Sequence, residues 1–145
     1  MNNLSKAVWF LLPALLLTQP GCSSTPAAQP APREEPEAVA RTEFTDRVEN
    51  YFEYEPLHAG KPSQVRIHLT ELQDGSPVEK AEVTLSVRPK GTQETVVQTT
   101  AKVGKVTGIY VAELVIPRAG NYNIEFHIQN VKLDERLPLE DFKVE

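Results

Sequence analysis

The stretch Gly120-Asn121-Tyr122-Asn123-Ile124-Glu125-Phe126-His127-Ile128 decides the fold class of this chain. Every second residue from Tyr122 to Ile128 is apolar, and the residues between them are polar, as in an extended strand whose side chains alternate between two faces. One apolar face and one polar face are typical of an antiparallel sheet that covers a core on one side and meets water on the other. We therefore predict a strand over this stretch.

The same alternation recurs elsewhere in the second half of the chain. It is clear at residues 65–69, 83–87 and 110–116, and weaker at 48–55, 94–101 and 139–144. Turn-forming residues separate these segments at 74–77, 89–91 and 104–108, and the short connection at 118–120 predicts a hairpin between its two neighbouring strands. Together they predict an all-β, immunoglobulin-like antiparallel β-sandwich of about seven strands over residues 44–145.

Tyr122 has two interpretations. The sequence Gly120-Asn121-Tyr122 at a strand start resembles the tyrosine corner of immunoglobulin-like folds, in which the hydroxyl bonds to the backbone a few residues upstream. The alternative is an ordinary core tyrosine.

The first 21 residues form a predicted signal peptide. Lys6 supplies a positive charge, and an apolar run follows at residues 7–17, too short to span a bilayer. Cys22, the single cysteine, stands where the lipobox of bacterial lipoproteins has its lipidated cysteine, although Gln19 and Pro20 depart from that pattern. We expect lipidation of Cys22, hence a lipid-anchored protein on the extracytoplasmic face of the cell envelope. The alternative is an ordinary secreted protein cut nearby.

Residues 22–43 are rich in proline, alanine, serine and glutamate and have almost no large apolar side chain. Such a composition cannot bury enough surface to offset its ordering entropy. We predict a disordered tether between the anchor and the folded domain.

The composition also bears on partners and chemistry. A formal net charge of −5 argues against binding to nucleic acid, which needs a basic face. Residues 23–145 contain no cysteine, and none of the serines stands in a nucleophile-elbow sequence. We expect no enzymatic activity and no cofactor.

Two sets of residues are candidate sites. His68 and His127 fall on polar strand faces, so a surface copper or zinc site between neighbouring strands is one hypothesis. Tyr51, Val111 and Val115 are apolar residues at positions where polar ones are expected, which is sometimes the mark of an interface.

Short motifs lie at residues 52–57, 59–63, 68–72, 77–78, 108–113 and 119–122. With these motifs the ordered part resembles the N-terminal β-domain of CzcB-type periplasmic adaptors of heavy-metal efflux pumps, and YtkA-like and FixH-like envelope domains. It implies a non-catalytic envelope module that docks to an efflux or oxidase-assembly protein. Two alternatives stay open: a periplasmic metal carrier that uses the surface histidines, and a structural spacer.

Overall fold

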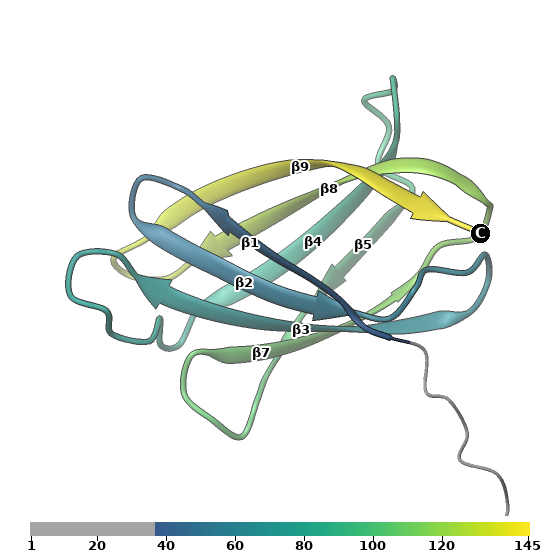
Figure 1. Cartoon of the computed structure of the whole chain (residues 1–145). Coiled ribbons are helices and arrows are strands. Elements are labelled where there is room, and N and C mark those ends of the chain that lie inside the picture. The colour runs from purple at the N-terminus through teal and green to yellow at the C-terminus, as the bar shows by residue number, and fades with distance from the viewer. Residues whose placement is uncertain (1–36) are drawn as a thin grey trace, which may run out of the picture. The chain divides into compact units, whose positions relative to one another are not determined.

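The computed structural model describes residues 37–145, which form nine strands and no helix (Figure 1). The expected signal peptide, Cys22 and the tether up to residue 36 lie outside these residues. Within residues 37–145 no helix is long and apolar enough to cross a membrane. The strands are β1 (Val39–Phe44), β2 (Val48–Tyr54), β3 (Pro62–Glu71), β4 (Glu82–Pro89), β5 (Val97–Thr100), β6 (Lys102–Val103), β7 (Ile109–Val115), β8 (Gly120–Gln129) and β9 (Asp134–Val144).

The strands form two antiparallel sheets that enclose one core. One sheet has five strands in the order β1-β2-β3-β7-β6, and the other has four in the order β5-β4-β8-β9. This arrangement confirms the predicted all-β sandwich. The C-terminus and the start of β1 lie at one end, and the β1–β2, β3–β4 and β8–β9 turns lie at the other (Figure 1). We call the latter the turn end.

The structure has nine strands where the sequence predicted about seven, and β1 is one of the additional strands. Residues 39–43, which we expected in the tether, pair with β2 as part of this edge strand. The apolar alternation is missing because the core-facing positions of β1 hold Arg41 and Glu43. The Arg41 guanidinium lies 4.8 Å from the ring centre of Phe142 and donates a hydrogen bond to the Glu140 carbonyl at 3.0 Å. A cation–π contact thus covers the core along this side of the sandwich.

The weak alternation at residues 94–101 corresponds to a chain segment that changes sheets. β5 pairs with β4 in the four-stranded sheet, whereas β6 pairs with β7 in the five-stranded sheet. The buried Ala101 lies at the crossing point. A continuous segment therefore links the two sheets along the side opposite β1.

The connection between β7 and β8 is not the hairpin that we predicted. β7 pairs with β3 and β6, and β8 pairs with β4 and β9, so this connection also passes from one sheet to the other. A short loop between two alternating strands fits both arrangements, because alternation does not identify the partner strand. Tyr122 secures the crossing, since its buried hydroxyl donates a hydrogen bond to the Arg118 carbonyl at 2.9 Å. The tyrosine-corner interpretation is the correct one.

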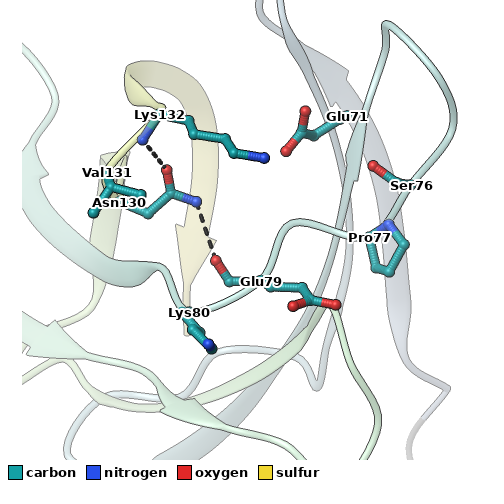
Figure 2. A pocket seen from close by; sticks show the side chains of 8 residues that line it. All are labelled: Glu71, Ser76, Pro77, Glu79, Lys80, Asn130, Val131 and Lys132. Atoms are coloured by element: carbon teal, nitrogen blue, oxygen red, sulfur yellow. Dashed lines mark hydrogen bonds between the residues drawn. The ribbon is translucent and has the colours of Figure 1, made fainter.

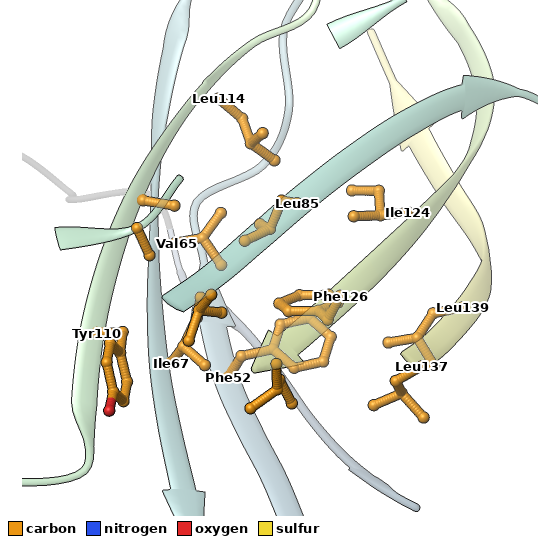
Figure 3. Close-up of a cluster of buried hydrophobic side chains, with 14 of the residues drawn as sticks. Phe52, Val65, Ile67, Leu85, Tyr110, Leu114, Ile124, Phe126, Leu137 and Leu139 are labelled. Atoms are coloured by element: carbon orange, nitrogen blue, oxygen red, sulfur yellow. The ribbon is translucent and has the colours of Figure 1, made fainter. Parts of the chain in front are cut away.

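The core lies between the sheets and is made by the inward residues of both (Figure 3). At its centre the rings of Phe52 and Phe126, one from each sheet, lie 4.8 Å apart in a tilted arrangement. Aromatic pairs of this kind add to the stability that comes from buried area. Asn50 is the exception among the inward residues of β2, because it is fully buried and its side-chain amide has no hydrogen-bond partner.

Candidate functional site

The three residues predicted as interface contacts lie on one surface, the outward face of the five-stranded sheet. Tyr51 is on β2, and Val111 and Val115 are on β7, with β3 between the two strands. All three alternate with buried residues, so their side chains point away from the core. We call this surface the β2–β7 face.

A polar network connects Tyr51 to β3. The Tyr51 hydroxyl donates a hydrogen bond to Glu53 Oε1 at 2.9 Å, and Arg66 Nη1 lies 3.9 Å from Glu53 Oε2. The hydrogen bond to Glu53, followed by desolvation and the charge of that carboxylate, raises the pKa of the Tyr51 hydroxyl. Arg66 is the register partner of Val111 on the other side. These side chains therefore form one continuous set across β2, β3 and β7, with Tyr51 at one end and Val111 at the other.

His68 belongs to the same face. It is the register partner of Tyr51 on one side and of Ile109 on the other. The His68 and Tyr51 rings meet edge to face with their centres 5.3 Å apart, and His68 Nε2 is buried without a hydrogen-bond partner. The row Tyr51, His68 and Ile109 thus forms a packed stripe across three strands.

The two candidate metal ligands do not meet. His68 is on β3 of the five-stranded sheet and His127 is on β8 of the four-stranded sheet, each on the outward face, so the core separates them. His127 Nε2 instead lies 2.7 Å from Asp134 Oδ1. Residues 37–145 contain no group of three or more His, Cys, Asp or Glu side chains arranged to hold a metal ion. The prediction of a site shared by the two histidines is wrong, because alternation reveals an outward position but not its sheet.

The outward faces of the two sheets differ in chemistry. The β2–β7 face includes Phe44, which is 58% exposed, and Val115, which is 44% exposed. The outward positions of the four-stranded sheet are polar apart from Pro138; on β4 and β8 they include Thr84, Ser86, Arg88, Asn123, Glu125 and His127. In that sheet Glu125 lies between Arg136 Nη1 at 3.1 Å and Arg88 Nη1 at 3.6 Å. Within the strands, aromatic and branched aliphatic side chains thus occupy the outward positions of only one of the two sheets.

A pocket of about 380 Å³ lies at the turn end (Figure 2). Asn130 organises it: its amide nitrogen donates a hydrogen bond to the Glu79 carbonyl at 3.1 Å, and its Oδ1 accepts one from the backbone of Lys132 at 2.8 Å. The remaining lining side chains are Glu71, Ser76, Pro77, Lys80 and Val131. Two carboxylates and two ammonium groups make the lining suitable for polar contacts, and it contains neither histidine nor cysteine.

A family model described as YtkA-like matches residues 45–127. The chain belongs to the YtkA-like family. No curated protein and no solved structure matches it. The matched range of the YtkA-like domain begins just before β2 and ends within β8, so it contains Tyr51, Val111 and Val115. A relationship between this YtkA-like chain and CzcB-type adaptors stays a prediction.

Sequence reasoning missed two members of the β2–β7 face of this YtkA-like domain. Phe44 is the first residue of the predicted domain, and the pairing of β1 with β2 places it on the outward face of the five-stranded sheet. Ile109 stood at a strand start, and only the pairing of β3 with β7 places it beside His68. No local signal in the sequence marks either contact.

Proposed function

We propose that this YtkA-like protein is a non-catalytic lipoprotein of the cell envelope, anchored through Cys22, that binds a protein partner through its β2–β7 face. In this proposal it serves metal efflux or metal homeostasis in the envelope. The lipobox-like position of Cys22 supports the anchor, and the family supports an envelope module.

The observation that carries the binding role is the difference between the two outward faces. The β2–β7 face combines four aromatic or aliphatic side chains with an arginine and a histidine: Tyr51, Ile109, Val111, Val115, Arg66 and His68. The strands of the four-stranded sheet have no such combination on their outward face. Aromatic side chains and arginine are enriched at the centres of protein interfaces, whereas a face covered by threonine, serine and charge pairs interacts well with water. The β2–β7 face therefore suits a partner that offers apolar side chains.

Site-specific photocrosslinking in intact cells tests the binding role. A photoreactive phenylalanine analogue would replace Val115 in the full chain, and a matched chain would carry it in place of Gln129, an exposed residue of the four-stranded sheet. We expect a discrete protein adduct from position 115 and none from position 129. Equal adducts from both positions, or none from position 115, would contradict the proposed face.

A separate measurement tests the anchor. Cells grown with labelled palmitate should transfer label to the wild-type chain and not to Cys22→Ser. Label on the Cys22→Ser chain, or an unlabelled wild-type chain, would refute the lipoprotein proposal and leave the binding face untouched.

A further inference from the structure

Each connection at the turn end exposes a large apolar side chain, within it or at the strand end that leads into it. The β6–β7 connection also belongs to this end, because the Leu69 N–H donates to the Gly108 carbonyl at 2.9 Å. The exposed side chains, one from each of the four connections, are Phe44 at 58%, Leu72 at 44%, Val106 at 60% and Val131 at 100%. Single exposed apolar residues are ordinary, whereas their gathering at one end of a domain marks a contact surface.

Charged side chains of both signs lie among these apolar tips. Each connection has one exposed base, and acids stand in or beside two of the connections; the eight residues are Arg47, Lys80, Lys105, Lys132, Asp46, Glu71, Asp74 and Glu79. All ion pairs within residues 37–145 lie elsewhere, on the sheets and near the C-terminus. The turn end therefore offers ammonium, guanidinium and carboxylate groups in equal numbers, and none of them is neutralised by a neighbour.

The pocket at the turn end brings part of this charge around one opening. Lys80, Lys132, Glu71 and Glu79 all line it, and Val131 stands beside them (Figure 2). Ammonium groups bind phosphate oxygens, and carboxylates bind ammonium groups. A zwitterionic phospholipid headgroup has both a phosphate and an ammonium group, so it complements this lining, and its acyl chains begin where the apolar tips would lie.

We propose that the turn end docks to a bilayer surface whose headgroups are zwitterionic, namely phosphatidylethanolamine. The apolar tips enter the boundary between headgroups and acyl chains, and the charged side chains stay among the headgroups. The balance of charge favours this occupant over an anionic surface, which attracts clusters of bases without acids. The tips stand on four separate connections, which suits a fluid surface better than one rigid apolar pocket in a protein. This contact is independent of the β2–β7 face.

The length of chain before β1 is compatible with this contact. β1 begins at the end of the domain opposite the turn end (Figure 1). β3, with ten residues, measures about 33 Å at about 3.3 Å per residue. Residues 22–38 reach about 50 Å at about 3.1 Å per residue. A chain held at Cys22 is thus long enough for the turn end to meet the same membrane.

Fluorescent labelling of single positions tests the contact. In the full chain with Cys22→Ser, an environment-sensitive fluorophore is attached to Val106→Cys or Val131→Cys, and to Gln64→Cys, an exposed position on β3, as the matched control. Vesicles of phosphatidylethanolamine and phosphatidylcholine should shift the emission of the two turn-end labels to shorter wavelength and leave the control label unchanged. No shift at the turn end, or the same shift at all three positions, would overturn the proposal.

Removal of the other apolar tips gives a second test. In the labelled Val131→Cys chain, Phe44→Ser together with Leu72→Ser should lower the ratio of inserted to free label at least about tenfold, because less apolar surface leaves water. Val39→Ser together with Val96→Ser is the control, since both residues are 40% exposed and lie outside the turn end. An unchanged ratio in the first variant, or an equal decrease in both, would contradict the proposed insertion.

The lipid composition tests the choice of headgroup. Addition of phosphatidylglycerol should not increase insertion, because the bases and acids of the turn end balance. Insertion that requires this anionic lipid would overturn the zwitterionic assignment. A photocrosslink from position 131 to a protein in intact cells, with none to lipid, would assign the turn end to a protein partner instead.

Discussion

Two buried tyrosine hydroxyls make different numbers of hydrogen bonds to the backbone. The Tyr110 hydroxyl donates to the Val78 carbonyl at 2.8 Å and accepts from the Ala81 N–H at 3.0 Å. It thereby joins β7 to the segment that leads into β4. The Tyr122 hydroxyl bonds to one backbone group, the Arg118 carbonyl. Loss of a hydroxyl costs more when it leaves more buried groups without a partner.

The domain should therefore lose different amounts of stability when Tyr110, Tyr122 and Tyr51 are each changed to phenylalanine. We expect Tyr110→Phe to lower the free energy of unfolding by about 2–3 kcal/mol and Tyr122→Phe by about 1 kcal/mol. Tyr51→Phe is the control, because its hydroxyl bonds to a carboxylate on the surface. Urea unfolding of the three variants measures the series. A loss for Tyr122→Phe no larger than that for Tyr51→Phe would show that the tyrosine corner adds nothing.

The ion pair between Lys90 and Asp141 predicts a dependence on pH. Lys90 Nζ donates to Asp141 Oδ1 at 2.9 Å, and this hydrogen bond, aided by the charge, lowers the pKa of Asp141 below its ordinary 3.8 and raises the pKa of Lys90 above 10.5. The stabilisation is present between those ordinary values. It is lost as the pH falls through the folded-state pKa of Asp141, and as it rises through that of Lys90.

Asp141→Asn tests this prediction, because asparagine also tolerates the positive φ at this position. Urea unfolding should show a lower free energy of unfolding for the variant at pH 7, and the difference from wild type should vanish well below pH 3.8. Lys90→Gln should show the same convergence in acid. A difference that does not change with pH would mean that the ion pair is not its cause.

At the scale of elements, the connection between β6 and β7 packs tightly against the β3–β4 segment. Gly108 has a φ of +80°, and a Cβ atom there would lie 2.6 Å from Pro77 Cβ. Its carbonyl also accepts the backbone N–H of Leu69 at 2.9 Å. Gly91, in the β4–β5 turn, has a similar φ of +84° but open space around it. A comparison of the two positions therefore separates the energetic cost of a side chain at positive φ from the cost of the steric contact with Pro77.

Gly91→Ala should cost about 1–2 kcal/mol, which is the usual penalty for a side chain in the left-handed region. Gly108→Ala should cost at least about 1 kcal/mol more, because Pro77 or the loop must also shift. Thermal unfolding of both variants gives the comparison. Equal losses would mean that the β6–β7 connection moves freely away from Pro77.

At the scale of the molecule, residues 37–145 contain no cysteine, so no disulfide joins the two sheets and the packing of the core is the main interaction between them. Phe52 lies at the centre of this packing, with its ring centre 4.8 Å from that of Phe126 and 6.3 Å from that of Phe142. Truncation of a buried phenylalanine costs about 3–5 kcal/mol, a large share of the roughly 5–15 kcal/mol that stabilises a typical domain.

We therefore expect Phe52→Ala to leave a largely unfolded or barely folded domain, and Phe52→Leu, which keeps more of the volume, to lose less than about 2 kcal/mol. Near-ultraviolet circular dichroism and urea unfolding distinguish the two variants. A well-folded Phe52→Ala chain with small loss of stability would show that the core repacks around the cavity.

The strands with regular alternation, such as those around Ile67, Leu85 and Ile124, were predictable because a half-buried strand repeats every two residues. β1 was not, because Arg41 and Glu43 occupy its inward positions and are tolerated only through contacts with β9 and with each other. Tyr51, Val111 and Val115 were predictable as outward apolar residues for the same local reason. That they share a face depends on β3 lying between their strands.

The sequence by itself determined the class of fold, most of the strands and the side on which each residue of a strand lies, because these properties follow from alternation over a few residues. Only the tertiary structure decided which strands pair, that the chain crosses between sheets at Ala101 and after β7, and that His68 and His127 lie on opposite faces. Pairing is set by contacts between segments far apart in the chain, and no short pattern encodes them. The β2–β7 face arises from that pairing.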